Sequence, residues 1–375
     1  MEDNKKLENL TEAAEVEEVE TLAVEEDTEV PLDKNIKLMS PTRMVLRRFF
    51  RSKLSIVGLI MIAFLFIFAF LGPEIYRGIY SSHFAGTDYE VGANMDEHVD
   101  RSEVIYETEK VITYIDPISG QEKHLIEIVY SPVALNAKAA PSLVHLLGTD
   151  ENGMDIFVRL MYGGRISLFI GFIVVFLETI IGVVLGGISG YFGGLVDQII
   201  MRIVDIFNCI PTLPILLIAS AVIDSWNLSP DQNIYVLMII ITIFGWSGTA
   251  RIVRGQILSL REQEYITATE VMGLPTWRKI FKHLIPNVMP QLIVSMTLGL
   301  GSVILYESTL SYLGLGVQYP KAAWGTMIAS TNDDTILKYH LNMWLPAGLL
   351  IVIAVLGFNF IGDGLRDAMD PKARK

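Results

Sequence analysis

The fold is decided by one apolar stretch near the middle of the chain, which reads ISLFIGFIVVFLETIIGVVLGGISGYF (Ile166–Phe192). Glu178 is its only charged residue. The run is longer than the roughly 18–20 residues that a helix needs to cross a bilayer. Because hydrocarbon offers the backbone no hydrogen bonds, such a run must satisfy its own polar groups as a helix. We therefore expect a membrane-spanning helix at this position.

Five further runs have the same character, so the sequence predicts a polytopic membrane protein. The 375 residues are 51% hydrophobic, and their mean hydropathy is +0.43. The expected fold class is all-α, with about six transmembrane helices and one small β-containing insertion. The other expected spans are Leu54–Leu71, Ile199–Ile223, Ile234–Ala250, Val288–Leu313 and Trp344–Ile361.

The formal charge of −13 belongs mainly to the N-terminus. Residues 1–33 hold 13 acidic side chains against two lysines, so the rest of the chain is close to neutral. We interpret residues 1–35 as an acidic, disordered cytoplasmic tail, either solubilising or regulatory, with a partner-binding helix as the alternative. The one cysteine, Cys209, excludes an internal disulfide, and the scattered histidines predict no metal site.

Lysine and arginine indicate the orientation. They are dense in residues 34–53 and 251–287 and sparse in the segments between the other spans, so both termini are expected in the cytoplasm of a cell-membrane protein. The expected organisation is then a basic flank and first helix, an extracellular insertion, a helical core and a cytoplasmic C-terminus. Their expected bounds are 36–72, 73–164, 165–366 and 367–375.

One cytoplasmic loop carries a pattern of its own, YITATEVMGLPTWRKIFKHLIPN (Tyr265–Asn287). Gly273 ends a first short helical stretch, and Pro275 opens a second. One face of the first stretch is formed by residues at i, i+3, i+4 and i+7. It either docks into a groove on a partner or rests on the bilayer surface as an amphipathic helix. The residues of this face are Tyr265, Ala268, Thr269 and Met272.

This loop resembles the EAA loop of ABC importer permeases, in which a short helix docks on the nucleotide-binding subunit. Thr267 and Thr269 depart from the family, which usually has Glu and Ala there. The matching positions are Ala268, Gly273, His283, Pro286 and Asn287. The resemblance thus implies a coupling segment at 261–287 within a permease core. The ATPase-coupling residues that it implies are Tyr265, Ala268, Thr269, Met272, Gly273, His283 and Pro286.

The resemblance covers roughly residues 40–375 and is closest to the second permease of the oligopeptide, dipeptide and nickel branch. Three further stretches match that branch: Leu147–Leu168, Glu307–Gly316 and Gly362–Pro371. Met154 stands where the branch usually has Arg, and its Pro-rich link is reduced at 319–323. The resemblance implies the type I ABC importer permease fold.

The same resemblance implies the partners. They are a homologous second permease, two ABC ATPase subunits that bind ATP and magnesium, an extracellular substrate-binding protein and the lipid bilayer, with no nucleic acid. The chain has no phosphate-binding GxxxxGK[ST] loop, so we expect no catalytic residue and no cofactor in it.

The substrate expected from the resemblance is a peptide. The enlarged insertion at 73–164, with expected strands at 104–108, 111–115 and 125–130, favours oligopeptides. It is either a cap over the helices or a contact for the binding protein. The alternatives are a nickel or other small-solute permease, or a proton-driven transporter, although no inverted repeat is visible.

Charged residues and glycines inside the spans complete the expectations. Glu178 and Glu307 either line the translocation path or pair between helices, and Glu307 is the preferred path residue. Asp205 is expected to pair with Arg202 or Arg251. Small residues four apart predict close helix packing. They are Gly182, Gly186 and Gly190.

Overall fold

The computed structural model describes residues 41–83, 107–115, 122–130, 137–143, 145–226, 228–318 and 321–369. The expected acidic tail at 1–35 and the expected turn at 116–120 lie outside this part of the chain, as do residues 370–375.

Five helical stretches in the described part are long and apolar enough to cross a membrane, and a bent helix pair makes a sixth if it counts as one span. This confirms the prediction of a largely helical membrane protein with about six spans. Three spans are single helices: α5 (Ile156–Phe192), α8 (Pro230–Arg261) and α14 (Leu341–Met369). The first span consists of α3 (Lys53–Phe66), the π-helical turn η1 (Ile67–Leu71) and the start of α4 (Gly72–His83). The fourth consists of α10 (Thr276–Arg278), the π-helical turn η2 (Lys279–Leu284) and α11 (Ile285–Tyr312).

The bent pair occupies the expected span Ile199–Ile223, in which Pro211 and Pro214 predict a break that is either a hinge or a static kink. It consists of α6 (Gly194–Cys209) and α7 (Thr212–Asp224), which meet at 80°. Pro211 lies in the break and forces the residue before it out of helical geometry, so Ile210 has φ −75° and ψ 125°. The break predicted in this span is therefore confirmed, and Pro211 explains the bend.

Helix α5 begins earlier than the apolar run from which it was predicted. Asp155 caps it, with its Oδ1 accepting a hydrogen bond from the backbone N–H of Val158 at 3.0 Å. Arg165, which marked the expected boundary, lies inside the helix and donates to the carbonyl oxygens of Ala69 and Phe70 at 2.7 and 2.9 Å. A charged residue is therefore accommodated in the helix because η1 presents carbonyl groups to it.

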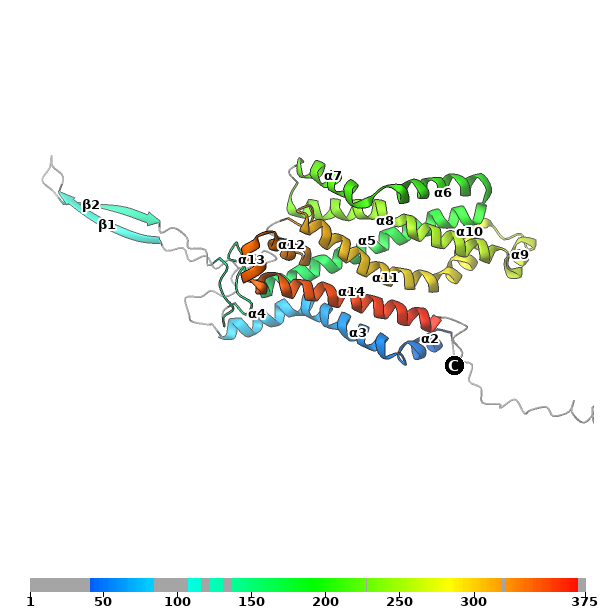
Figure 1. Ribbon diagram of the computed structural model, residues 1–375, viewed down its shortest axis with the longest axis horizontal. Coiled ribbons are helices and arrows are strands. Elements are labelled where there is room, and N and C mark those ends of the chain that lie inside the picture. The colour runs from blue at the N-terminus through cyan, green and yellow to red at the C-terminus, as the bar shows by residue number, and fades with distance from the viewer. Residues whose placement is uncertain are drawn as a thin grey trace, which may run out of the picture. The chain divides into compact units, whose positions relative to one another are not determined.

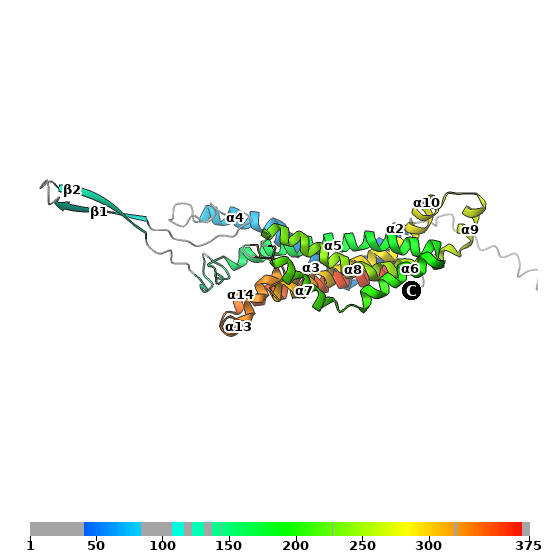
Figure 2. The same cartoon turned by 90° about the horizontal axis from the view of Figure 1, so that it is seen from above.

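The helices pack through glycines. Figure 1 shows α14 beside both α3 and α11, and both views place α5 beside α8 (Figures 1 and 2). Between α5 and α8, a Cβ on Gly186 would lie 2.3 Å from the carbonyl oxygen of Ala250, and one on Gly190 would lie 2.9 Å from that of Arg254. The expected small-residue stripe is thus used for packing inside this chain.

A two-stranded antiparallel sheet lies within the expected insertion. Strand β1 (Glu107–Ile115) pairs with β2 (Glu122–Tyr130), so that Glu107 faces Tyr130. The expected strands at 111–115 and 125–130 fall inside β1 and β2. The described residues of the expected strand at 104–108 form the start of β1 and not a separate strand. The location of this hairpin outside the cell stays a prediction.

The remaining elements are short. They are α2 (Pro41–Phe49), α9 (Glu264–Val271), α12 (Trp324–Ala329), the 3-10 turn η3 (Ser330–Asn332) and α13 (Asp334–Tyr339).

Candidate functional site

The loop that joins α8 to α11 has the architecture expected from its glycine and proline. Gly273 has φ +69°, a conformation that favours glycine. Its N–H donates to the carbonyl oxygen of Glu270 at 2.9 Å, and the N–H of Leu274 donates to that of Thr269 at 3.1 Å. These two bonds form a Schellman motif that ends α9. Pro275 then has φ −66° and ψ 146° and caps α10.

One side of this loop is packed on the chain itself. Ile266 and Leu284 are buried in an apolar cluster with Val253 and Ile257 of α8. Thr269 is only 4% exposed, and its hydroxyl donates to the carbonyl oxygen of Ile266 at 2.6 Å. The placement of Thr269 on the exposed face was therefore wrong, because α9 turns this side toward α8.

The loop also carries large apolar side chains that are exposed. Four large apolar side chains are between 61% and 86% exposed. Tyr265, Ala268 and Met272 belong to the exposed side of α9, as the helical spacing predicted. Exposed apolar side chains that are concentrated in one short loop are candidates for an interaction surface. We call it the coupling face, and its four large members are Val271, Met272, Trp277 and Phe281.

The other expected coupling residues lie where the loop enters α11. His283 is half-buried in η2, and Pro286 is exposed at the second position of α11, where proline is tolerated. Asn287 donates through its side-chain amide to the hydroxyl of Tyr265 at 3.2 Å and to the carbonyl oxygen of His283 at 2.6 Å. The end of the loop is thus bonded back to its beginning.

Two basic residues join the loop to the C-terminal end of α5, and sequence reasoning missed both contacts. Arg261 donates to the carbonyl oxygens of Gly190 and Tyr191 at 3.4 and 3.2 Å. The ammonium group of Lys279 lies 5.6 Å from the centre of the Tyr191 ring and 3.2 Å from the carboxylate of Glu270. Cations at a helix C-terminus interact favourably with its dipole. Displacement of this loop would therefore be transmitted directly to α5.

A further ion pair joins the ends of α5, α6 and α8. Arg254 makes a two-point contact of 2.5 Å with the carboxylate of Asp197, which also accepts a hydrogen bond of 2.5 Å from Ser189. No short-range sequence signal predicts this pair, since its members are separated by 57 positions. Asp205, in contrast, pairs with Arg251 at 2.9 Å, as one of the two expected alternatives.

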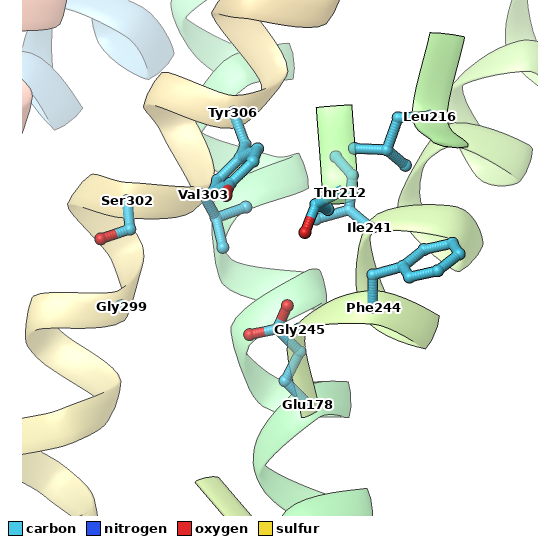
Figure 3. A pocket seen from close by; sticks show the side chains of 10 residues that line it. All are labelled: Glu178, Thr212, Leu216, Ile241, Phe244, Gly245, Gly299, Ser302, Val303 and Tyr306. Atoms are coloured by element: carbon cyan, nitrogen blue, oxygen red, sulfur yellow. The ribbon is translucent and has the colours of Figure 1, made fainter. Parts of the chain in front are cut away.

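The two carboxylates within the spans have different surroundings. Glu178 lines a cavity of about 190 Å³ between α5, α7, α8 and α11 (Figure 3). Glu307 is 0% exposed, and its two carboxylate oxygens accept hydrogen bonds from Ser167 at 3.0 Å and Ser311 at 2.7 Å. Glu307 is therefore not among the residues that line this cavity, and the preference for it over Glu178 as the path residue stays a prediction.

Glu307 instead belongs to a buried polar junction. Ser167 of α5 also accepts a hydrogen bond from the backbone N–H of Trp324 at 3.2 Å, and the indole of Trp324 donates to the carbonyl oxygen of Leu160 at 2.9 Å. The junction joins α5, α11 and the start of α12. A serine four residues after Glu307 is the sequence signal that could have indicated this role.

At the N-terminal end of α5, the stretch that begins at Leu147 consists of turns that are joined by side-chain contacts. Arg159 contacts Asp150 at 3.2 Å and donates to the sulfur of buried Met154 at 2.8 Å. Met154, the residue that departs from the related family, is thus buried against Arg159.

A separate ion pair joins this stretch to the turn before α13. Lys138 contacts the carboxylate of Asp333 at 3.4 Å. The pKa of Asp333 lies below its ordinary value, mainly because its carboxylate accepts a hydrogen bond from the backbone N–H of Thr335.

The described residues contain no group of three or more His, Cys, Asp or Glu side chains that could hold a metal ion.

The chain resembles known transport proteins over almost all of its length. Residues 182–375 match the family model "Binding-protein-dependent transport system inner membrane component", and residues 40–89 match "N-terminal TM domain of oligopeptide transport permease C". The oligopeptide transport system permease protein OppC of Bacillus subtilis is 46% identical over 241 residues, which are 64% of this chain and 76% of the relative.

Two further comparisons extend this result. The dipeptide transport system permease protein DppC of the same organism is 35% identical over 338 residues, or 90% of this chain and 88% of the relative. A solved structure of the MetNI methionine ABC transporter in an inward-facing conformation aligns with a TM-score of 0.42 and 20% identity, covering 56% of this chain and 96% of that one. The chain is a multi-pass membrane protein that belongs to the family of binding-protein-dependent transport system inner membrane components.

Proposed function

We propose that this chain is the permease subunit of an ABC importer that moves peptides into the cytoplasm. The observation that carries the proposal is the coupling face, an exposed apolar surface on a loop that is bonded to both α5 and α8. Relatives that are named oligopeptide and dipeptide permeases support a peptide substrate. These names do not favour nickel or another small solute.

The proposal assigns the remaining parts of the machine to other chains. Two ATPase subunits hold ATP and magnesium, a homologous permease completes the pathway, and an extracellular binding protein delivers the peptide. This chain has the type I permease fold, with both termini in the cytoplasm and the hairpin outside. This chain itself does not catalyse ATP hydrolysis.

The coupling segment at 261–287 converts ATPase movement into helix movement. Closure of the ATPase dimer around ATP moves α9 and α10, and the contacts of Arg261 and Lys279 pass this displacement to the end of α5. Because α5 also lines the cavity that contains Glu178, the same displacement reaches the candidate path. Coupling between the ATPase-docking loop and the cavity requires an element whose position changes when either of the two sites changes its state.

The test is a substitution on the coupling face. Met272→Glu places a charge on a surface that is buried when the ATPase docks, and burying an unpaired charge is strongly unfavourable. We expect the amount of ATPase that co-purifies with this chain from membranes to fall at least about tenfold, which corresponds to roughly 1.4 kcal/mol of binding free energy.

The matched control is Tyr339→Glu, which changes an exposed large side chain on α13, outside the coupling segment. It should leave ATPase co-purification unchanged. If Met272→Glu and Tyr339→Glu both retain the full amount of ATPase, the coupling face is not the docking surface and the proposal loses its main support.

A further inference from the structure

The cavity beside Glu178 has a mostly apolar lining with a few polar groups. Its volume is about 190 Å³, below the roughly 300–1,000 Å³ of pockets that enclose a drug-sized ligand. It can therefore hold the end of an extended ligand but not a whole peptide. The residues that line it are Glu178, Thr212, Leu216, Ile241, Phe244, Gly245, Gly299, Ser302, Val303 and Tyr306.

Glycine at position 245 makes room for the carboxylate of Glu178. A Cβ at Gly245 would lie only 1.6 Å from one carboxylate oxygen of Glu178, so no other residue fits there without displacing the acid. Figure 3 shows the carboxylate directed into the space between α11 and α8, below Val303 and Tyr306. The acid on α5 and the glycine on α8 thus form one structural unit.

The carboxylate has no partner among the described residues. Glu178 makes no hydrogen bond or ion pair with any residue that the structure describes, and the cavity lining contains no lysine, arginine or histidine. A carboxylate within a membrane span is costly unless it is paired or faces a polar path. The chemical group that would pair with it is a compact cation with several N–H donors.

We propose that the cavity beside Glu178 is a binding site for the α-ammonium group of a peptide during its passage through the permease. The inference rests on the proposed function, since peptides are the substrates that carry such a group. The carboxylate supplies the charge, and the hydroxyls of Thr212, Ser302 and Tyr306 lie around the cavity as additional acceptors. The apolar lining strengthens the ion pair by excluding water.

The test compares two forms of one peptide in the assembled transporter. The complex of both permeases, the ATPase subunits and the binding protein is placed in proteoliposomes with ATP. The probes are a pentapeptide with a free α-amino group and the same pentapeptide acetylated at that nitrogen, chosen so that the binding protein retains both at saturating concentration. The measured quantity is the ratio of their initial uptake rates.

Glu178→Gln should reduce this ratio about tenfold or more relative to the wild-type transporter, because the neutral amide no longer forms a charge-assisted pair with the ammonium group. The selectivity of the binding protein cancels because the same binding protein serves both transporters. Asp205→Asn is the matched control, with the same loss of a carboxylate within a span at a residue that does not line the cavity. It should leave the ratio unchanged.

An unchanged ratio in Glu178→Gln would overturn the proposal, whether total uptake stays normal or falls for both peptides. Uptake that falls equally for both peptides would assign Glu178 to pairing with another subunit or with a proton. Failure of the wild-type transporter to take up either peptide with ATP would instead refute the proposed function, so the two failures are distinguishable.

Discussion

Glu178 and Glu307 are the same residue type in equally apolar sequence, yet their surroundings differ. Both oxygens of Glu307 are hydrogen-bonded to serines, whereas Glu178 lies beside a glycine and a cavity. A buried carboxylate with satisfied hydrogen bonds stabilises one arrangement of helices, and a carboxylate on a cavity is available to a ligand. The two acids therefore differ in whether described residues of the chain satisfy their carboxylate oxygens.

The junction around Glu307 should be a source of stability. Glu307→Ala removes the acceptor of two buried serine hydroxyls and should reduce the free energy of unfolding by about 1–3 kcal/mol. Thermal unfolding of the purified protein in detergent checks this. Thr309→Ala, at an exposed position on the same helix, is the control. Equal unfolding temperatures for the two variants would contradict a structural role for Glu307.

At the scale of the element, the close packing of α5 against α8 depends on glycines, which have no side chain. The glycines of α5 allow the backbone of α8 to approach until carbonyl oxygens of one helix lie against Cα atoms of the other. Helices in a bilayer gain no hydrophobic free energy from association, so close packing of this kind holds them together.

Gly186→Ala should therefore separate the two helices, because its Cβ would lie 2.3 Å from the carbonyl oxygen of Ala250. We expect a loss of about 1–3 kcal/mol in the free energy of unfolding, measured by thermal unfolding. Gly248→Ala is the matched control, since nothing lies within 4 Å of a Cβ there. It should be neutral or stabilising by about 0.5–1 kcal/mol. A similar loss in both variants would exclude the packing explanation.

Elements were predictable from the sequence where the signal was local. Apolar length located the spans, and Gly273 and Pro275 located the turn between α9 and α10. The bend between α6 and α7 lies at the break that Pro211 predicted. The start of α5 at Ile156 was not predicted, because Arg165 is accommodated inside the helix by carbonyl groups of η1, which is distant in the sequence. The contact of Lys279 with Tyr191 has no short-range pattern, so the attachment of the loop to α5 needed the structure.

At the scale of the whole molecule, the chain connects two surfaces at different depths. The coupling face lies at one end of the helices, and the cavity beside Glu178 lies within the spans of α5, α8 and α11. Helix α5 belongs to both, since its C-terminal end contacts Arg261 and Lys279 and its middle carries Glu178. This connection is what an ATP-driven permease requires, and a proton-driven transporter has no use for the coupling face.

The most direct test measures what energises uptake. Proteoliposomes that contain this chain and its second permease, with or without the ATPase subunits, are supplied with the binding protein and a labelled peptide outside, and with either enclosed ATP or an imposed proton gradient. We predict uptake only when both ATP and the ATPase subunits are present. Uptake driven by the proton gradient without the ATPase subunits would contradict the proposal that this chain is an ABC importer permease.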